Sequence, residues 1–349
     1  MYQSTFHANL EAGMWRKTLL GLALLGALAA LRFLPLSNPP TQQDASIKIQ
    51  RPLMGTVWGI EVIHHGNAPA AQQAIDAAFS ELERIDRLMS EWKPDSPISQ
   101  VNQNAGKHPV EVPQELRAML QRSIRYSEIS HGAFDITWRG MGRIWHFDDT
   151  FTVPAKQDVE KARRNVDYRA LQIDGNRVFL PRPEMSIGLG GIAKGYAVDR
   201  AAHVLDQAGF RDYLVDGGGD IRVSGNKQGH PWNLGIQHPR EPRGTLLGRV
   251  RLTKGVLVTS GDYERFRIVD GVRYHHIIDV RTGYPAMACQ SVSILAPEAE
   301  KAVVLAKVVF ILGPEQGIAI ARAEGAEVLA IDAAGKRHAT EGFRKVLEE

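Results

Sequence analysis

Apolar residues recur at helical spacing in several stretches of this chain. Between residues 70 and 89 they fall on one side of a helix, at Ala71, Ile75, Ala78, Leu82, Ile85 and Met89, which predicts an amphipathic helix packed against a core. The same spacing predicts further helices at residues 114–130, from Tyr196 to about Gly209, and at residues 299–312 and 315–324.

Short apolar runs between these helices predict strands at residues 56–63, 213–215, 220–223, 248–252 and 327–332. Asp174-Gly-Asn176 and Asp270-Gly271 each separate two such runs and predict β-hairpins. Residues 90–113 are expected to form an irregular loop. Interleaved helices and recurrent hairpins favour an α+β fold, with a mixed or antiparallel sheet and flanking helices in a single large domain.

The N-terminus has the pattern of a targeting segment. Arg16 and Lys17 precede an apolar run from Leu19 to Leu31, and the polar residues 37–46 follow. This predicts a signal peptide or membrane anchor over residues 1–36, a linker over 37–46 and a folded domain over 47–349 on the periplasmic side of the inner membrane. Retention and cleavage of the leader both remain open. No cysteine follows the apolar run, so the chain is not expected to be a lipoprotein.

Composition excludes several classes of protein. The chain has 349 residues, and its formal net charge of +3 comes from scattered basic residues, which argues against nucleic acid as a partner. Cys289 is the only cysteine, so an intramolecular disulfide, a cysteine zinc site and an iron–sulfur cluster are excluded.

The segment Ile187–Asp199 joins a short apolar strand to an amphipathic helix and contains four glycines and Lys194. Glycines at such a turn let the backbone approach a ligand closely, and the amide groups of a helix start favour an anion. The spacing matches neither the Walker A nor the Rossmann pattern. The segment therefore predicts a nucleotide or phosphate site of another kind, with a turn needed only for close helix–sheet packing as the alternative.

Two more segments concentrate polar groups. In Asp216-Gly-Gly-Gly-Asp220 we expect both carboxylates to bond amides of the glycine-rich turn. His275 and His276 are adjacent, so on a strand they face opposite sides, with Ile278 on the side of His276. One of them at most can serve a given site as general acid or base. Asp279-Val-Arg-Thr-Gly283 is compatible with an Asx-type turn.

These segments, in this order, resemble the bacterial FAD:protein FMN transferases, the ApbE family. The resemblance extends from Leu53 to about Gly325. It rests on an ordered set of short motifs: Leu53-Met-Gly-Thr56, Ser90-Glu-Trp92, Asp95-Ser-Pro-Ile-Ser-Gln-Val-Asn102, Ala133-Phe-Asp135, Leu189-Gly-Gly-Ile-Ala-Lys-Gly195, Ser260-Gly-Asp-Tyr263, His276-Ile-Ile-Asp279, Thr282-Gly283 and Leu312-Gly-Pro-Glu315.

The resemblance implies a T-fold-like domain and an activity. Family members use Mg2+ to split FAD and transfer FMN to a threonine of an acceptor flavoprotein, releasing AMP. It implies exported flavoproteins of redox complexes as partners and His276 as the base for the threonine hydroxyl. The flavin and nucleotide contacts that it implies are Met54, Trp92, Ala133, Phe134, Asp135, Gly188, Lys194 and Ile278.

The chain departs from the family pattern where the metal is expected. Gly188 stands where the family has an aspartate, and Val303 and Lys307 stand where it has the aspartate and threonine that bind Mg2+. Only a backbone carbonyl near Gly191 carries over as a metal contact. Mg2+ prefers oxygen ligands, which valine and lysine side chains do not offer. Lys307 is therefore a candidate substitute for the cation, with a solvated helix residue as the alternative.

Three functions remain open on these grounds: an FMN transferase acting on exported flavoproteins, a catalytically impaired relative that carries FAD or serves as a scaffold, and an interaction protein without flavin. Retention of His276, Lys194 and the glycine turn favours the first two. Loss of the metal ligands favours the last two. The chain lacks the family's acceptor-type motif, so we do not expect it to be flavinylated itself.

Overall fold

The computed structural model describes residues 45–348. The chain divides into two units, Met1–Gln43 and Asp44–Glu349. The predicted leader and nearly all of the predicted linker lie outside the described residues. Within residues 45–348, no helix is both long and apolar enough to cross a membrane.

An eight-stranded sheet forms the centre of the domain, in the order β1-β2-β6-β7-β10-β15-β16-β17. All neighbouring strands in it run antiparallel, which confirms the antiparallel alternative of the predicted sheet. The strands are β1 (Ser46–Leu53), β2 (Thr56–Ile63), β6 (Tyr213–Asp216), β7 (Asp220–Ser224), β10 (Lys254–Gly261), β15 (Cys289–Ala296), β16 (Glu327–Asp332) and β17 (Arg337–Ala339).

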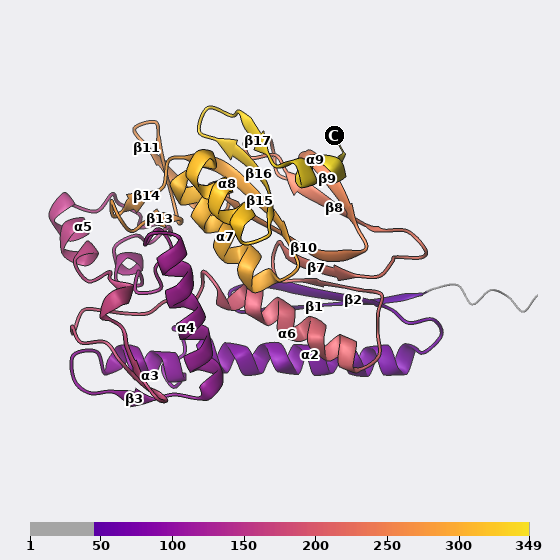
Figure 1. The fold of residues 1–349 in the computed structure, drawn as a ribbon, viewed down its shortest axis with the longest axis horizontal. Coiled ribbons are helices and arrows are strands. Elements are labelled where there is room, and N and C mark those ends of the chain that lie inside the picture. The colour runs from indigo at the N-terminus through magenta and orange to yellow at the C-terminus, as the bar shows by residue number, and fades with distance from the viewer. Residues whose placement is uncertain (1–44, 349) are drawn as a thin grey trace, which may run out of the picture. The chain divides into compact units, whose positions relative to one another are not determined.

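Four helices cover one face of this sheet (Figure 1). They are α2 (Ala68–Met89), α6 (Ala193–Gln207), α7 (Ala299–Leu312) and α8 (Pro314–Ala323). Each contacts the next in the order α2, α6, α7, α8. Helix α7 is apolar on nearly all sides because it packs between the sheet, α6 and α8. The largest core cluster of the described residues fills this layer.

The opposite face packs against a small sheet, β18-β9-β8, and the short helix α9 (Glu341–Val346). The strands are β8 (Trp232–Gln237), β9 (Leu246–Leu252) and β18 (Leu347–Glu348). Alternation along β10 shows how one strand serves both faces: Val256 and Val258 join the helical core, and Leu257 joins the second core with Trp232.

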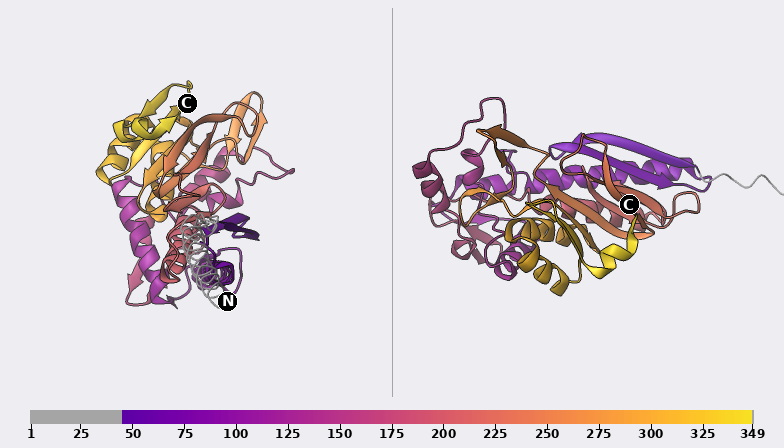
Figure 2. Two further views of the ribbon diagram at one scale, coloured as in Figure 1. Left: turned by 90° about the vertical axis from the view of Figure 1, so that its right-hand side faces the viewer. Right: turned by 90° about the horizontal axis from the view of Figure 1, so that it is seen from above.

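The remaining elements gather at one end of the main sheet, as the views in Figures 1 and 2 show. They are α3 (Pro97–Gln103), β3 (Val110–Glu111), α4 (Gln114–Ile129), η1 (Met141–Arg143), α5 (Lys156–Arg163), η2 (Tyr168–Ala170), β4 (Gln172–Asp174), β5 (Arg177–Phe179), β11 (Phe266–Val269), β12 (Val272–His275), β13 (Ile278–Asp279) and β14 (Tyr284–Pro285). Both predicted hairpins are confirmed, as β4–β5 and β11–β12.

The predicted uninterrupted loop over residues 90–113 is wrong, because α3 and β3 lie within it. Ser96 caps α3 by accepting a hydrogen bond from the Ser99 amide (3.1 Å), and Pro97 occupies the first turn, where its missing N–H costs nothing. Both signals stand in the sequence, but the helix has only 7 residues and its apolar pattern is correspondingly short.

Candidate functional site

The glycine turn is held in place by side chains from two segments and by one backbone hydrogen bond. The side-chain amide of Asn102 donates to the Ile187 carbonyl (2.9 Å) and accepts from the Ile187 amide (2.7 Å). The Trp138 indole donates to the Gly188 carbonyl (3.2 Å), and the Gly188 amide donates to the Ile136 carbonyl (2.8 Å). Helix α6 begins at Ala193, so the predicted helix after the turn is confirmed. The predicted strand before it is wrong, because only an isolated bridge pairs Ser186 with Trp138 there.

Gly191 lies where three site segments meet. A methyl group on Gly191 would lie 3.2 Å from Cε2 of Phe134 and 3.6 Å from Cδ of Lys307. The structure thus brings the buried Ala133–Asp135 segment and helix α7 to the same turn. A side chain here would press on the Phe134 ring, which would have to shift by a few tenths of an ångström.

The carboxylate of Asp135 organises its own loop. One oxygen accepts hydrogen bonds from the Thr137 amide (2.8 Å) and hydroxyl (2.7 Å), and the other accepts from the Tyr168 amide (2.9 Å). Burial raises the pKa of Asp135, and these hydrogen bonds oppose that shift. Asp135 therefore positions Ala133 and Phe134 beneath the glycine turn.

Two ammonium groups share one carboxylate beside Gly191. Lys194 lies in the first turn of α6, and its Nζ is 3.9 Å from an oxygen of Asp220. Asp220 also attracts Lys307, whose Nζ donates a hydrogen bond to the Val303 carbonyl (3.2 Å). Burial lowers the pKa of Lys307 to about 8, and Asp220 opposes the shift. We call Lys194, Lys307 and Asp220 the lysine cluster.

The close approach of α6 and α7 sets the geometry of this cluster. Gly195 packs so tightly on the start of α7 that a methyl group there would lie 2.3 Å from the Ala299 carbonyl oxygen. The carboxylate of Asp199 accepts hydrogen bonds from the amides of Ala299 and Glu300 (3.0 and 2.9 Å) and so caps α7 from α6.

The two aspartates of the glycine-rich segment behave differently. Asp216 accepts a hydrogen bond from the Gly219 amide (2.7 Å), as predicted for a turn carboxylate. For Asp220 the same prediction is wrong, because its buried carboxylate faces Lys194 and Lys307. A carboxylate in a glycine-rich turn has amides within reach from its own segment, whereas the lysines come from two distant helices. The sequence alone could not show that these helices meet here.

His276 and His275 differ as sharply. His275 is buried, its Nε2 lies 2.7 Å from the Ala286 carbonyl, and its Nδ1 accepts from the Ile277 amide. His276 is exposed, yet enough neighbouring atoms surround its ring to affect its pKa. Burial, followed by the positive charges of His275, Lys307, Arg265 and Lys194, lowers the pKa of His276. Its ring is therefore neutral at pH 7 and can accept a proton.

Ile278 does not share the environment of His276. Strand β12 ends at His275, and Ile278 begins β13, so the alternation expected for one continuous strand is interrupted. Ile278 is buried against Met141, Trp145 and Val159. Asp279 forms the expected Asx-type turn, accepting from the Arg281 amide (3.0 Å).

Met54 lies in the two-residue turn between β1 and β2. Met54 and Gly55 both have positive φ, 49° and 73°, which is the conformation of a type I′ hairpin turn. The turn approaches the histidine segment through Arg265, which donates to the Gly55 carbonyl (3.5 Å), while the His276 amide donates to the Arg265 carbonyl (3.1 Å).

Glu91 and Arg139 join the site without having been singled out in the sequence. The Glu91 carboxyl group lies beside the glycine turn, since a methyl group at Gly188 would lie 3.3 Å from its Oε1 and one at Gly190 would lie 3.8 Å from it. Burial raises the pKa of Glu91, and Arg139 opposes the shift. Arg139 also donates to the Glu91 carbonyl (2.9 Å) and stacks on the exposed ring of Trp92 (4.6 Å).

The residues at the family's metal position do not fit Mg2+. Val303 is 1% exposed and belongs to the apolar core, and Lys307 places an ammonium group there. Among residues 45–348, no group of three or more His, Cys, Asp or Glu side chains is arranged to hold a metal ion. A single backbone carbonyl near Gly191 cannot satisfy a cation that requires a shell of oxygen ligands.

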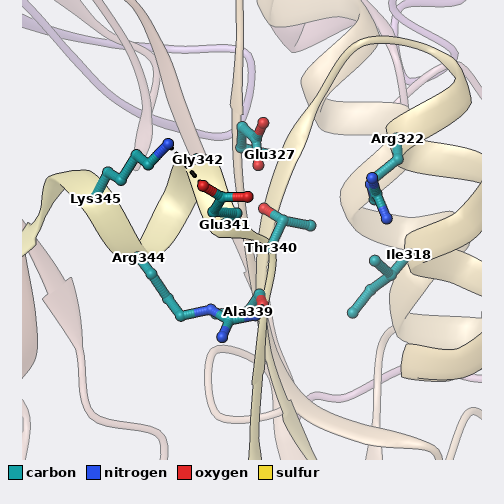
Figure 3. Close-up of a pocket in the computed structure, with 9 residues that line it drawn as sticks. All are labelled: Ile318, Arg322, Glu327, Ala339, Thr340, Glu341, Gly342, Arg344 and Lys345. Atoms are coloured by element: carbon teal, nitrogen blue, oxygen red, sulfur yellow. Dashed lines mark hydrogen bonds and ion pairs between the residues drawn. The ribbon is translucent and has the colours of Figure 1, made fainter.

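A separate recess of about 470 Å3 lies between α8, β16, β17 and α9 (Figure 3). Charged side chains of both signs line it, including the ion pair between Lys345 and Glu341 at 2.7 Å. It contains none of the predicted site residues. We therefore place the candidate site at the glycine turn.

Comparison with known proteins agrees with this fold. The ApbE family model matches residues 54–330. A FAD:protein FMN transferase of Vibrio cholerae is 31% identical, over 93% of this chain and 99% of its own, and one of Treponema pallidum is 34% identical, over 77% and 80%. The crystal structure of the ApbE protein of Thermotoga maritima superposes with a TM-score of 0.79 at 30% identity, covering 87% of this chain and 100% of that one.

The fold and site therefore define a protein of the flavin transferase type. This chain belongs to the ApbE family.

Proposed function

We propose that this protein transfers FMN from FAD to a threonine hydroxyl of an acceptor protein and releases AMP. The carrying observation is that two ammonium groups and a neutral, solvent-open imidazole converge at the glycine turn. Relatives named FAD:protein FMN transferase over most of the chain support the same activity.

The reaction requires few groups from the protein. The threonine oxygen bonds to the phosphorus of the FMN half as the bond from that phosphorus to the bridging oxygen breaks, and the electron pair leaves with AMP. His276 takes the hydroxyl proton. The nearby cations lower the pKa of His276 in the free protein, and the negative diphosphate of bound FAD offsets that effect. Substrate binding therefore makes the imidazole a better base.

The test is transfer of FMN to an acceptor domain with an exposed threonine. The full chain, purified in mild detergent, is incubated with FAD and the acceptor, with and without Mg2+, and covalent flavin is detected by in-gel fluorescence. His276→Ala should lower the transfer rate about 100-fold or more, because the general base is lost, and should leave FAD binding intact. His203→Ala, on the exposed side of α6, is the matched control.

A second function, FAD binding without transfer, is favoured by Val303 and Lys307 at the metal position. FAD binding with no covalent product under either condition would replace the transferase by a carrier or scaffold. Absence of FAD binding would remove both functions.

We also propose that the domain acts outside the cytoplasm, on exported flavoproteins of redox complexes at the inner membrane. The support is the order of basic, apolar and polar residues before residue 47. In intact spheroplasts, externally added protease should digest the domain while a cytoplasmic marker survives. Protection of the domain until the membrane is lysed would contradict this location.

A further inference from the structure

The lysine cluster carries more positive than negative charge. Lys194 and Lys307 contribute two ammonium groups against the single carboxylate of Asp220. Asp216, the other nearby acid, is bonded to the Gly219 amide, and His276 is neutral. The cluster can therefore accept an additional anion. It lies against the glycine turn, which is where we expect the ligand to approach the backbone.

Lys307 is oriented for that role. Its Cδ and Cε lie 3.6 and 3.7 Å from the position of a methyl group on Gly191, so the stem crosses the turn and does not extend away from the helix into solvent. An ammonium group has three protons to donate. One goes to the Val303 carbonyl of its own helix, which leaves donating capacity for a phosphate oxygen.

The backbone of the turn provides less than its sequence predicts. A methyl group on Gly188 or Gly190 would lie 3.3 or 3.8 Å from Oε1 of Glu91, so a phosphate group at that end of the turn would meet this carboxyl group. Neutralisation of a bound diphosphate must then come chiefly from side chains at the Gly191 end of the turn, which are Lys194 and Lys307.

We infer that Lys194 and Lys307 hold the diphosphate of FAD through their two ammonium groups, without a divalent metal ion. The inference rests on the proposed function, because it takes FAD as the ligand. Ammonium groups fixed on two packed helices supply the positive charge, and Val303, an aliphatic side chain in the core, leaves no oxygen donor for a competing cation.

The experiment is titration of the full chain with FAD, followed by flavin fluorescence and calorimetry, in EDTA and in Mg2+. We expect the same Kd in both media. Lys307→Met keeps the length of the side chain and removes the charge, and it should weaken FAD binding about tenfold or more. Lys301→Met on the same helix is the control, because Lys301 donates to the Glu324 carbonyl away from the turn. Its Kd should match that of the unaltered protein.

A second variant tests whether restoring oxygen donors makes FAD binding depend on Mg2+. Val303→Asp combined with Lys307→Thr supplies oxygen donors, so its FAD binding should become stronger in Mg2+ than in EDTA. A melting curve of each variant verifies folding.

The outcomes separate the two proposals. Binding of FAD by the unaltered protein only when Mg2+ is present would overturn metal independence and leave the proposed function standing. Equal binding by Lys307→Met and the unaltered protein would also overturn it. No FAD binding in either medium would overturn the proposed function and, with it, this inference.

Discussion

Two charged clusters border helix α6, and they are built on opposite plans. In the first, Arg84 donates to both oxygens of Glu81 (2.8 and 3.0 Å) and to both oxygens of Glu115 (2.7 and 2.8 Å). Arg200 donates to Glu81 (3.0 Å), and the Tyr196 hydroxyl donates to Glu115 (2.7 Å). In the lysine cluster, the closest approach of opposite charges is 3.9 Å.

The difference separates a structural role from a binding role. The first cluster matches two carboxylates with two guanidinium groups, so its charges are satisfied before any ligand arrives, and its function is to tie α2, α4 and α6 together. The lysine cluster matches one carboxylate with two ammonium groups. Incomplete charge pairing among buried groups lowers the stability of the free protein. Binding of an anion restores that stability.

Replacing Asp220, the carboxylate that the two lysines share, should produce the largest difference between the two clusters. Burial raises the pKa of Asp220, so replacing it with the neutral amide in Asp220→Asn should cost the free protein little unfolding free energy, while two ammonium groups are left without a negative partner. Saturating FAD should then raise the melting temperature of the variant more than that of the unaltered protein. Chemical denaturation and thermal melts with and without FAD measure the two effects.

The matched control is Glu115→Gln, also a change from carboxylate to amide. Arg84 keeps Glu81 as a partner there, so the loss of unfolding free energy should stay below about 1 kcal/mol, with no change in FAD binding. A larger change in the FAD response from Glu115→Gln than from Asp220→Asn would reverse the roles assigned to the two clusters.

Lowering the pH should destabilise the fold through the first cluster and stabilise it through the lysine cluster. We expect this effect to be smaller than that of Asp220→Asn on the response to FAD. Hydrogen bonds from Arg84, then from Arg200, lower the pKa of Glu81 from 4.5 to about 2. Its contribution is therefore complete above pH 4.5 and is lost as the pH falls toward 2. Burial raises the pKa of Asp220, so its protonation on acidification favours the folded state.

Urea unfolding at pH 7 and pH 3 measures this contrast. Relative to the unaltered protein, Glu81→Gln should lose less stability on acidification, by about 1 kcal/mol after screening by solvent. Equal losses in the two proteins would show that the Glu81 pairing contributes nothing.

Much of the fold follows from periodicity. Helix α7 and strands β2 and β16 have the predicted bounds, because their apolar positions are long and regular. Strand β1 was missed, since its Met54-Gly55 turn uses a methionine at positive φ, which is not a typical hairpin signal. Helix α3 was missed because it is short.

The candidate site was only partly predictable. Lys194 and the glycine turn stand in one local pattern, and His276 and Lys307 came from family resemblance. Glu91 stood only within a family motif and Arg139 gave no signal, because the contacts that join them to each other and to Gly188 link residues far apart in the sequence. The prediction for Asp220 was wrong because the packing of α6 against α7 determines which groups its carboxylate meets.

The bare backbone of Gly195 has a consequence for how the protein distinguishes ligands. Since the first turn of α6 presses directly on the carbonyl of Ala299, the origins of the two lysines are spaced by main chain against main chain. A ligand therefore meets two ammonium groups whose helices cannot readily move apart, so only the flexible side-chain stems can adjust to its size.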